Sequence, residues 1–236
     1  MGMKKCAPAA LGYLLVVGIF LSGTWLGSRA VTAMAQRTPV ERSRTIVIDA
    51  GHGGEDGGAV SCTGVSEKQI NLETALRLND LLHLLGYRTR MIRSEDLSVY
   101  TEGQTIAQKK VSDLKHRVQM VNETDEPVLV SIHQNLFADQ RYSGAQVFYG
   151  SAGEGQLLAK AVQSELIRTL NPGSHREIKA AAGVYLMERV TCTSILVECG
   201  FLSNPEEEAK LRTPEYQKKL CCVIGTALAD FLDGQT

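Results

Sequence analysis

Short apolar runs alternate along this chain with longer segments in which apolar residues recur at helical spacing. Thr45 to Asp49 is a β-branched run followed by glycines, which predicts a buried strand and then a loop. Such alternation predicts an α/β fold, a single domain with a mixed, mostly parallel sheet and helices on both faces. Further strands are expected over residues 87–92, 127–132, 145–149, 184–187 and 194–197.

Helices are expected between these strands. Ser66 and Gln69 have the spacing of a capping box that opens the first long helix, and Gly86 ends that helix. The other helices are expected over 111–121 and 158–170 and after the pairs Asn204-Pro205 and Thr213-Pro214, in which proline follows a capping residue.

The first residues are predicted to lie outside this fold. Lys4 and Lys5 precede an uncharged run from Ala7 to Leu26, which indicates export and is long enough to span a membrane. Ala33 and Ala35 then form a small-x-small cleavage pattern, so a cleaved signal peptide and an N-terminal membrane anchor both stay open. We expect a signal or anchor over 1–35, a linker over 36–43 and a catalytic domain over 44–236.

The composition is that of a globular protein. Hydrophobic residues make up 44% of the chain, and the formal net charge is −1, so no nucleic-acid partner is expected. The six cysteines contain no C-x-x-C pair, which argues against a thiolate zinc cluster and a thioredoxin-like site. They are interpreted as small core residues, and a disulfide between Cys192 and Cys199 stays open.

Four polar residues fall where α/β sheets gather their ligands, at the carboxyl ends of strands. His52 follows the first strand, and Glu67 opens the first long helix. His133 and Glu198 each follow an apolar strand. Two histidines and one carboxylate form a catalytic zinc set, and Glu198 would then be the general base for the attacking water. Structural roles at a turn, a helix start or a strand end stay open, because the residues are distant in sequence.

The segments around these residues resemble the zinc-dependent N-acetylmuramoyl-L-alanine amidase family. Asp113-Leu114 followed by Arg117 also looks like a helix motif of that family. The other matching segments are 46–54, 66–68, 131–135 and 197–204, in the family's order.

The resemblance implies a six-stranded sheet of the zinc exopeptidase/phosphorylase-like type. It implies Zn²⁺ held by His52, Glu67 and His133, with Glu198 as the catalytic acid/base. The implied substrate is peptidoglycan, cut at the amide between the lactyl group of N-acetylmuramic acid and L-alanine.

A narrower resemblance concerns the stretch from Tyr142 to Tyr149, which looks like the sporulation amidases of endospore-forming bacteria. It implies a role in spore cortex maturation, where peptide removal precedes muramic-δ-lactam formation. It also implies a lipoprotein activator. The expected location is outside the cytoplasm, either anchored in the membrane or secreted to the cell wall or forespore intermembrane space.

Other polar residues have weaker assignments. Arg117 is predicted to bind a stem carboxylate, with an ion pair at the helix surface as the alternative. Asn135 is predicted to orient His133 or to contact the substrate. Ala50 and Gln134 depart from the family pattern, and Gln134 is expected to narrow the cleft beside His133.

Two other functions stay open. One is a non-catalytic peptidoglycan-binding scaffold on an amidase fold, and the other is a zinc peptidase similar to carboxypeptidases. No metal contact is expected from His83, His116 or His175, which lie in amphipathic helices or a polar loop.

Overall fold

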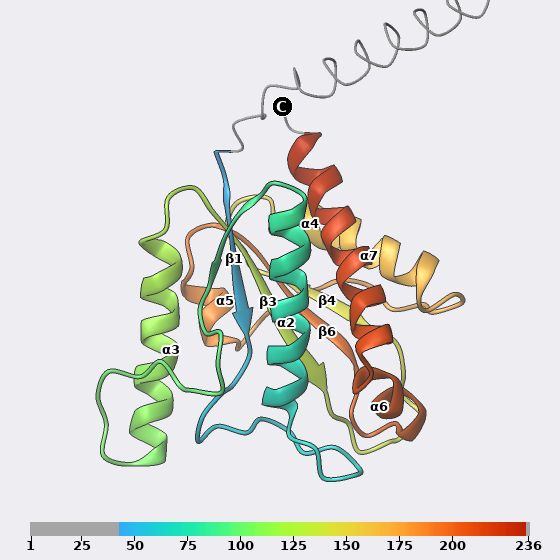
Figure 1. The fold of residues 1–236 in the computed structure, drawn as a ribbon, viewed down its shortest axis with the longest axis horizontal. Helices are drawn as coiled ribbons and strands as arrows, with labels where there is room; N and C mark the ends of the chain where they lie inside the picture. The colour runs from blue at the N-terminus through green and yellow to red at the C-terminus, as the bar shows by residue number, and fades with distance from the viewer. Residues whose placement is uncertain (1–42, 235–236) are drawn as a thin grey trace, which may run out of the picture. The chain divides into compact units, whose positions relative to one another are not determined.

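Six strands form one central sheet with the order β2-β1-β3-β6-β4-β5. Figure 1 labels β1, β3, β6 and β4 in the middle of this sheet. Neighbouring strands are parallel except β4 and β6, which are antiparallel. The predicted mixed, mostly parallel sheet is therefore confirmed. The strands are β1 (Thr45–Ala50), β2 (Arg88–Met91), β3 (Pro127–Asn135), β4 (Gln146–Tyr149), β5 (Lys179–Ala180) and β6 (Thr193–Phe201).

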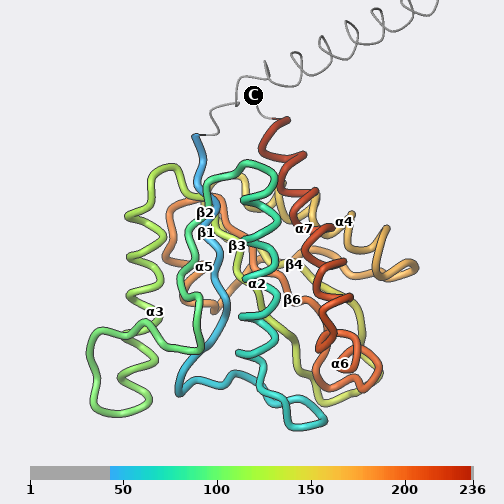
Figure 2. Tube along the Cα trace, viewed as in Figure 1, coloured from blue at the N-terminus to red at the C-terminus, as the bar shows by residue number. Residues whose placement is uncertain are grey.

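Helices cover both faces of the sheet. One apolar core joins α2, α4 and α7 to one face, and a second joins α3 and α5 to the other. Although α2 and α7 lie far apart in sequence, they run side by side (Figure 2). The helices are α2 (Glu67–Leu84), α3 (Ile106–Asn122), α4 (Gly155–Thr169), α5 (Tyr185–Arg189), α6 (Pro205–Leu211) and α7 (Pro214–Asp233).

This computed structural model describes residues 43–234. The predicted signal or anchor and nearly all of the predicted linker lie outside the described residues, as does Cys6. Within the described range, no helix is long and apolar enough to cross a membrane.

The strand predicted over 184–187 is wrong. Helix α5 occupies this segment, and the two-residue strand β5 forms the edge of the sheet instead. Leu186 and Met187 are both buried in the core that α5 shares with α3. An apolar run this short has no periodicity that distinguishes a strand from a helix.

The capping box predicted at Ser66 is also wrong. The Ser66 hydroxyl donates to the carbonyl of Gly57 rather than accepting from its own helix. Carbonyls of the preceding loop accept from the first N–H groups of α2, because Glu67 donates to Ala59 and Lys68 to Gly57. A capping box forms instead at Thr105, the N-cap of α3. The predicted caps Asn204 and Thr213 are confirmed.

The cysteines of the described range are free, so the Cys192–Cys199 disulfide is not formed. Cys199 and Cys221 are buried, as predicted for small core residues. Cys62 is exposed, and so is Cys222. For these two residues the core interpretation is wrong.

Candidate active site

The three predicted metal ligands converge at the carboxyl ends of β1 and β3. His52 Nε2 lies 3.2 Å from Glu67 Oε2, and His133 Nδ1 lies 3.0 Å from Glu67 Oε1. One ligand atom from each residue lies within 4.8 Å of the other two. Of the histidine, cysteine and acidic side chains in the described residues, these three lie close enough together to hold a metal ion.

The donor chemistry of this group fits zinc. Burial acts to raise the pKa of Glu67, but hydrogen bonds and charge interactions with His133 and His52 outweigh it and hold that pKa far below its usual range. Glu67 is therefore ionised, which is the ligating form. Two imidazoles and one carboxylate leave a fourth tetrahedral position for water, as in catalytic zinc sites.

His52 is oriented by an unusual backbone conformation and by Asp56. Its φ of 62° lies in the left-handed region that non-glycine residues rarely adopt. Its Nδ1 lies 3.0 Å from Asp56 Oδ2, which leaves Nε2 for a metal. Burial lowers the pKa of His52, but Glu67 and Asp56 outweigh it and the pKa is raised. Asp56 was not among the predicted site residues, although an acid four residues after a candidate ligand was a usable signal.

Glu67 is fixed by donors to both of its oxygens. The backbone N–H of Ala59 donates to Oε2, and the backbone N–H of Gln134 donates to Oε1. The side chain of Asn71 also donates to Oε1, from one helical turn further along α2. Asn71 was not among the predicted site residues either, although its spacing of four from Glu67 placed it on the same helix face.

Two glycines make room for this cluster. A Cβ at Gly51 would lie 2.2 Å from His133 Nε2, and a Cβ at Gly58 would lie 2.6 Å from Glu67 Oε2. Gly58 also has a φ of +67°, which favours glycine. The glycine-rich loops therefore allow the backbone to approach the ligands closely.

Arg117 does not lie where a substrate contact is expected. It is 2% exposed and pairs with Asp49 and Asp113, and it donates to the carbonyls of Ala50 and His52. Burial acts to lower the pKa of Arg117, but the two aspartates raise it. The ion pair of the alternative prediction is therefore present, although it is buried rather than at the helix surface, and the burial of Arg117 argues against the predicted stem contact. Arg117 is a positioning residue that holds the His52 loop.

Arg93 is a second buried arginine beneath the same loop. It is 2% exposed, and its guanidinium donates to the carbonyls of Ala50, Gly51 and Lys68. No sequence pattern singled it out, because its partners are backbone groups of segments distant in the chain.

Glu198 lies within β6, directly opposite His133 of β3. Its Oε2 is buried and has no hydrogen-bond partner within the described part of the chain. Burial raises the pKa of Glu198 to about 7, and the charge of Glu67 adds to the increase. A carboxyl group with such a pKa, beside a metal site, can take up and release a proton near neutral pH.

The remaining predicted residues have mixed outcomes. Gln134 is 3% exposed and its side chain donates to Asn71, so it does not narrow the cleft. Asn135 ends β3, and its carbonyl accepts from Leu202. A substrate contact by the Asn135 side chain stays a prediction. His83, His116 and His175 lie outside the metal-ligand group of the described residues.

Comparisons with known proteins give one consistent answer. The profile of the family described as N-acetylmuramoyl-L-alanine amidase matches residues 46–230. The germination-specific N-acetylmuramoyl-L-alanine amidase of Bacillus subtilis is 40% identical over 183 residues, which cover 77% of this chain and 76% of that protein.

Solved structures agree with this result. The CwlD amidase from Clostridioides difficile, solved in complex with the GerS lipoprotein, is similar with a TM-score of 0.77 and 36% identity. The similarity covers 80% of this chain and 98% of that one. An N-acetylmuramoyl-L-alanine amidase from Clostridium difficile 630 has a TM-score of 0.72 and 27% identity, covering 83% of this chain and 100% of that chain.

Proposed function

Because this chain belongs to the N-acetylmuramoyl-L-alanine amidase family of cell-wall hydrolases, we propose that it works with zinc held by His52, Glu67 and His133. The bond cut is the amide between the lactyl group of N-acetylmuramic acid and L-alanine in peptidoglycan. The observation that carries the proposal is the convergence of these three side chains beside Glu198.

Zinc bound to these residues supplies a Lewis acid for the scissile carbonyl and lowers the pKa of the attacking water. The proton transfers are assigned to Glu198. Glu198 accepts the proton of that water at its carboxylate and returns it to the nitrogen of the departing L-alanine. Its raised pKa suits both steps, because the group exchanges a proton at little cost near neutral pH.

We also propose a role in spore cortex maturation, in which peptide removal precedes muramic-δ-lactam formation. The germination-specific relative supports this role. The solved complex of the similar CwlD amidase with a lipoprotein supports a lipoprotein partner for this chain. The apolar stretch near the N-terminus supports export, either as a signal or as an anchor.

One experiment tests the chemistry. The full chain is purified, its zinc content is measured, and it is incubated with muropeptides. Release of an intact stem peptide from the sugar supports the amidase. Zinc without sugar–peptide cleavage would favour a peptidase or an enzyme that depends on its lipoprotein activator, and neither zinc nor turnover would favour a scaffold. Glu198→Ala is expected to keep zinc and to lose about 10²- to 10⁴-fold in kcat. Full activity of this variant would contradict the role given to Glu198.

A second experiment tests the spore role. Deleting the gene in its host is expected to remove muramic-δ-lactam from the cortex while leaving vegetative wall composition unchanged. A normal lactam content in the spores of the deletion strain would contradict the proposal. Complementation with the Glu198→Ala variant controls for functions of the protein that need no catalysis.

A further inference from the structure

A groove of about 1240 Å³ opens beside β4, the strand that pairs with the Glu198-bearing strand β6. Its walls come from the 139–144 loop, the 170–177 loop and the start of α6. Gln146 of β4 lies among its lining residues. The roles described above leave this groove without a function.

The register of the sheet connects this groove to the catalytic residues. Phe148 and Leu196 are directly opposite on β4 and β6, and both pack toward α3 and α5. Gln146 and Glu198 are also directly opposite, two residues away on each strand, so their side chains share that face. His133 stands opposite Glu198 on the other side. The groove therefore begins one strand beyond the general base.

Arg176 is held rigidly in this groove. Its Nε donates to the carbonyl of Ser143 at 2.7 Å, and its Nη1 donates to Gln146 Oε1 at 3.1 Å. Its guanidinium carbon lies 4.5 Å from the centre of the Phe201 ring and 5.9 Å from that of Tyr142. Nη2 makes no hydrogen bond to any described residue, so part of a pre-positioned guanidinium fork remains available.

The charge of Arg176 also lacks an ion-pair partner among the described residues. Burial lowers the pKa of Arg176, and the acid that acts most strongly on it is Glu207. However, Glu207 Oε1 accepts from the backbone of Gly144 and its Oε2 from that of Phe201. A half-buried, oriented guanidinium without its own carboxylate is suited to bind a carboxylate from outside.

We propose that Arg176 binds a free carboxylate of the stem peptide and thereby makes the enzyme selective for acidic stems. The inference rests on the proposed amidase function, since it assigns the groove to the substrate's peptide side. Free carboxylates occur on the stem, whereas the lactyl carboxyl of the muramic acid is consumed in the scissile amide. The groove therefore takes the peptide rather than the glycan.

The distances in the sheet agree with this assignment. Neighbouring strands lie ~4.8 Å apart, which separates Gln146 from Glu198. The hydrogen bond from Arg176 Nη1 to Gln146 Oε1 adds 3.1 Å. The guanidinium of Arg176 therefore lies roughly 8–10 Å from Glu198. Consecutive Cα atoms of the stem are ~3.8 Å apart. The second stem residue, a glutamate linked through its side chain, places its α-carboxylate within about 8 Å of the scissile nitrogen.

The test compares two muropeptides with the full zinc-loaded chain purified in detergent. One carries a free α-carboxylate on the second stem residue, and the other carries a carboxamide there. The wild type is expected to prefer the acid by about 10- to 100-fold in kcat/KM, through KM. Arg176→Gln should lose this preference because its KM rises for the acidic muropeptide only. Arg176→Lys should keep part of the preference.

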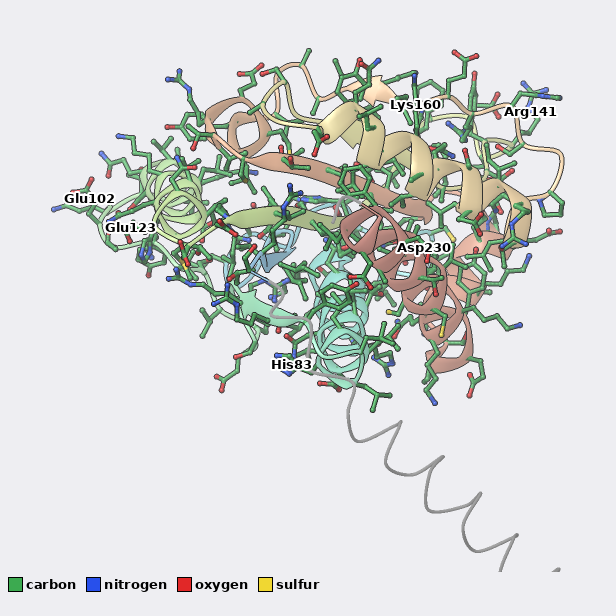
Figure 3. All side chains as sticks on the ribbon, turned by 90° about the horizontal axis from the view of Figure 1, so that it is seen from above. His83, Glu102, Glu123, Arg141, Lys160 and Asp230 are labelled. Carbon is green, nitrogen blue, oxygen red and sulfur yellow. The ribbon has the colours of Figure 1, made fainter. Side chains whose placement is uncertain are left out.

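Arg141→Gln is the matched control. Arg141 lines the same groove, but its side chain is 90% exposed, it pairs with Asp139, and it points outward at the edge of the molecule (Figure 3). This variant should retain the selectivity of the wild type. The proposal would be overturned if Arg176→Gln lost kcat/KM equally on both muropeptides. It would also be overturned if the wild type cleaved the acid and carboxamide muropeptides with the same kcat/KM.

Binding of the released stem tripeptide separates this inference from the proposed function, because it requires no turnover. Calorimetry measures the affinity of the acid and amide tripeptides for each protein. Arg176→Gln is expected to bind the acid tripeptide more weakly than the wild type does, whereas its affinity for the amide tripeptide should be unchanged. If the wild type binds the acid selectively but cleaves neither muropeptide even when the lipoprotein partner is added, the stem site stands and the proposed function fails. Equal affinity of the wild type for both tripeptides would overturn the stem site.

Discussion

Replacing Arg117 by methionine tests whether the buried ion network assembles the metal site. The side chains of Arg117 and Asp49 are 3% and 2% exposed, and they form an ion pair. The substitution leaves the Asp49 carboxylate buried without this partner and removes the hydrogen bond to the His52 carbonyl. Breaking a buried pair in this way costs about 3–5 kcal/mol of unfolding free energy. For a domain of this size, the melting temperature should therefore fall by about 6–20 °C.

The same variant should bind zinc more weakly. His52 has a φ of 62°, which its surroundings must enforce, and the hydrogen bond from Arg117 to its carbonyl is part of that enforcement. By analogy with other residues that orient metal ligands, the affinity should fall by about 10- to 100-fold. Competition with a fluorescent zinc chelator measures this affinity, and thermal melting of the metal-free protein measures the stability separately.

Two further variants show whether the effect is specific. The double variant Asp49→Asn with Arg117→Met removes both charges, so it should recover part of the stability lost by Arg117→Met alone. Arg168→Met removes an exposed arginine paired with Glu165 and should leave melting and zinc binding unchanged. Unchanged melting and zinc affinity of Arg117→Met would refute the reasoning.

Three other predictions concern the site itself. The pKa of Glu198 is raised from an ordinary value of 4.5 to about 7. Between these two pH values the metal-free folded protein therefore keeps a proton that the unfolded chain has lost. The free energy of unfolding should consequently fall as pH rises from 4.5 to about 7. Urea unfolding across that range should show a flatter pH profile for Glu198→Gln, and an unchanged profile would contradict the assignment. Asp56→Asn should weaken zinc binding about 10- to 100-fold by loosening His52, with kcat of the zinc-saturated enzyme largely retained. Gly51→Ala would place a Cβ 2.2 Å from the His133 ring, so it should lose zinc in equilibrium dialysis, and a variant with normal zinc content would contradict the close packing.

The convergence of His52, Glu67 and His133 could be predicted because these residues lie at the ends of recognisable elements. His52 and His133 lie at the carboxyl ends of apolar strands that pair in parallel, and Glu67 begins a helix. The carboxyl ends of parallel strands meet at one edge, so their order in the sheet brings the ligands together. The pattern of strands and helices was therefore sufficient to predict that these residues lie close together. The family resemblance was needed to predict zinc and the reaction.

The two supporting arginines, Arg93 and Arg117, could not be predicted in the same way. Arg93 and Arg117 act on backbone carbonyls and on Asp49, and such contacts depend on the three-dimensional path of the His52 loop. An arginine on a helix has the same sequence pattern whether it faces solvent, a ligand or a buried aspartate. The stem contact predicted for Arg117 is disfavoured because its helix packs against the sheet with that residue turned inward.

The segment 184–187, for which a strand was wrongly predicted, packs on the sheet face that also carries His133 and Glu198. Helix α5 has 5 residues, so it spans only about 7.5 Å. Strands β3 and β6 have 9 residues each and extend about 30 Å beneath it. Leu186 and Met187 of this helix share a core with Leu196, which lies two residues before Glu198 on β6. His133, Glu198 and Gln146 form the next row on the same face, and Gln146 is 4% exposed because Arg176 and the carbonyl of Glu177 bond to its side chain. The segment with the wrongly predicted strand therefore covers the apolar part of this face, whereas the 170–177 loop covers the Gln146 end of the row that contains Glu198.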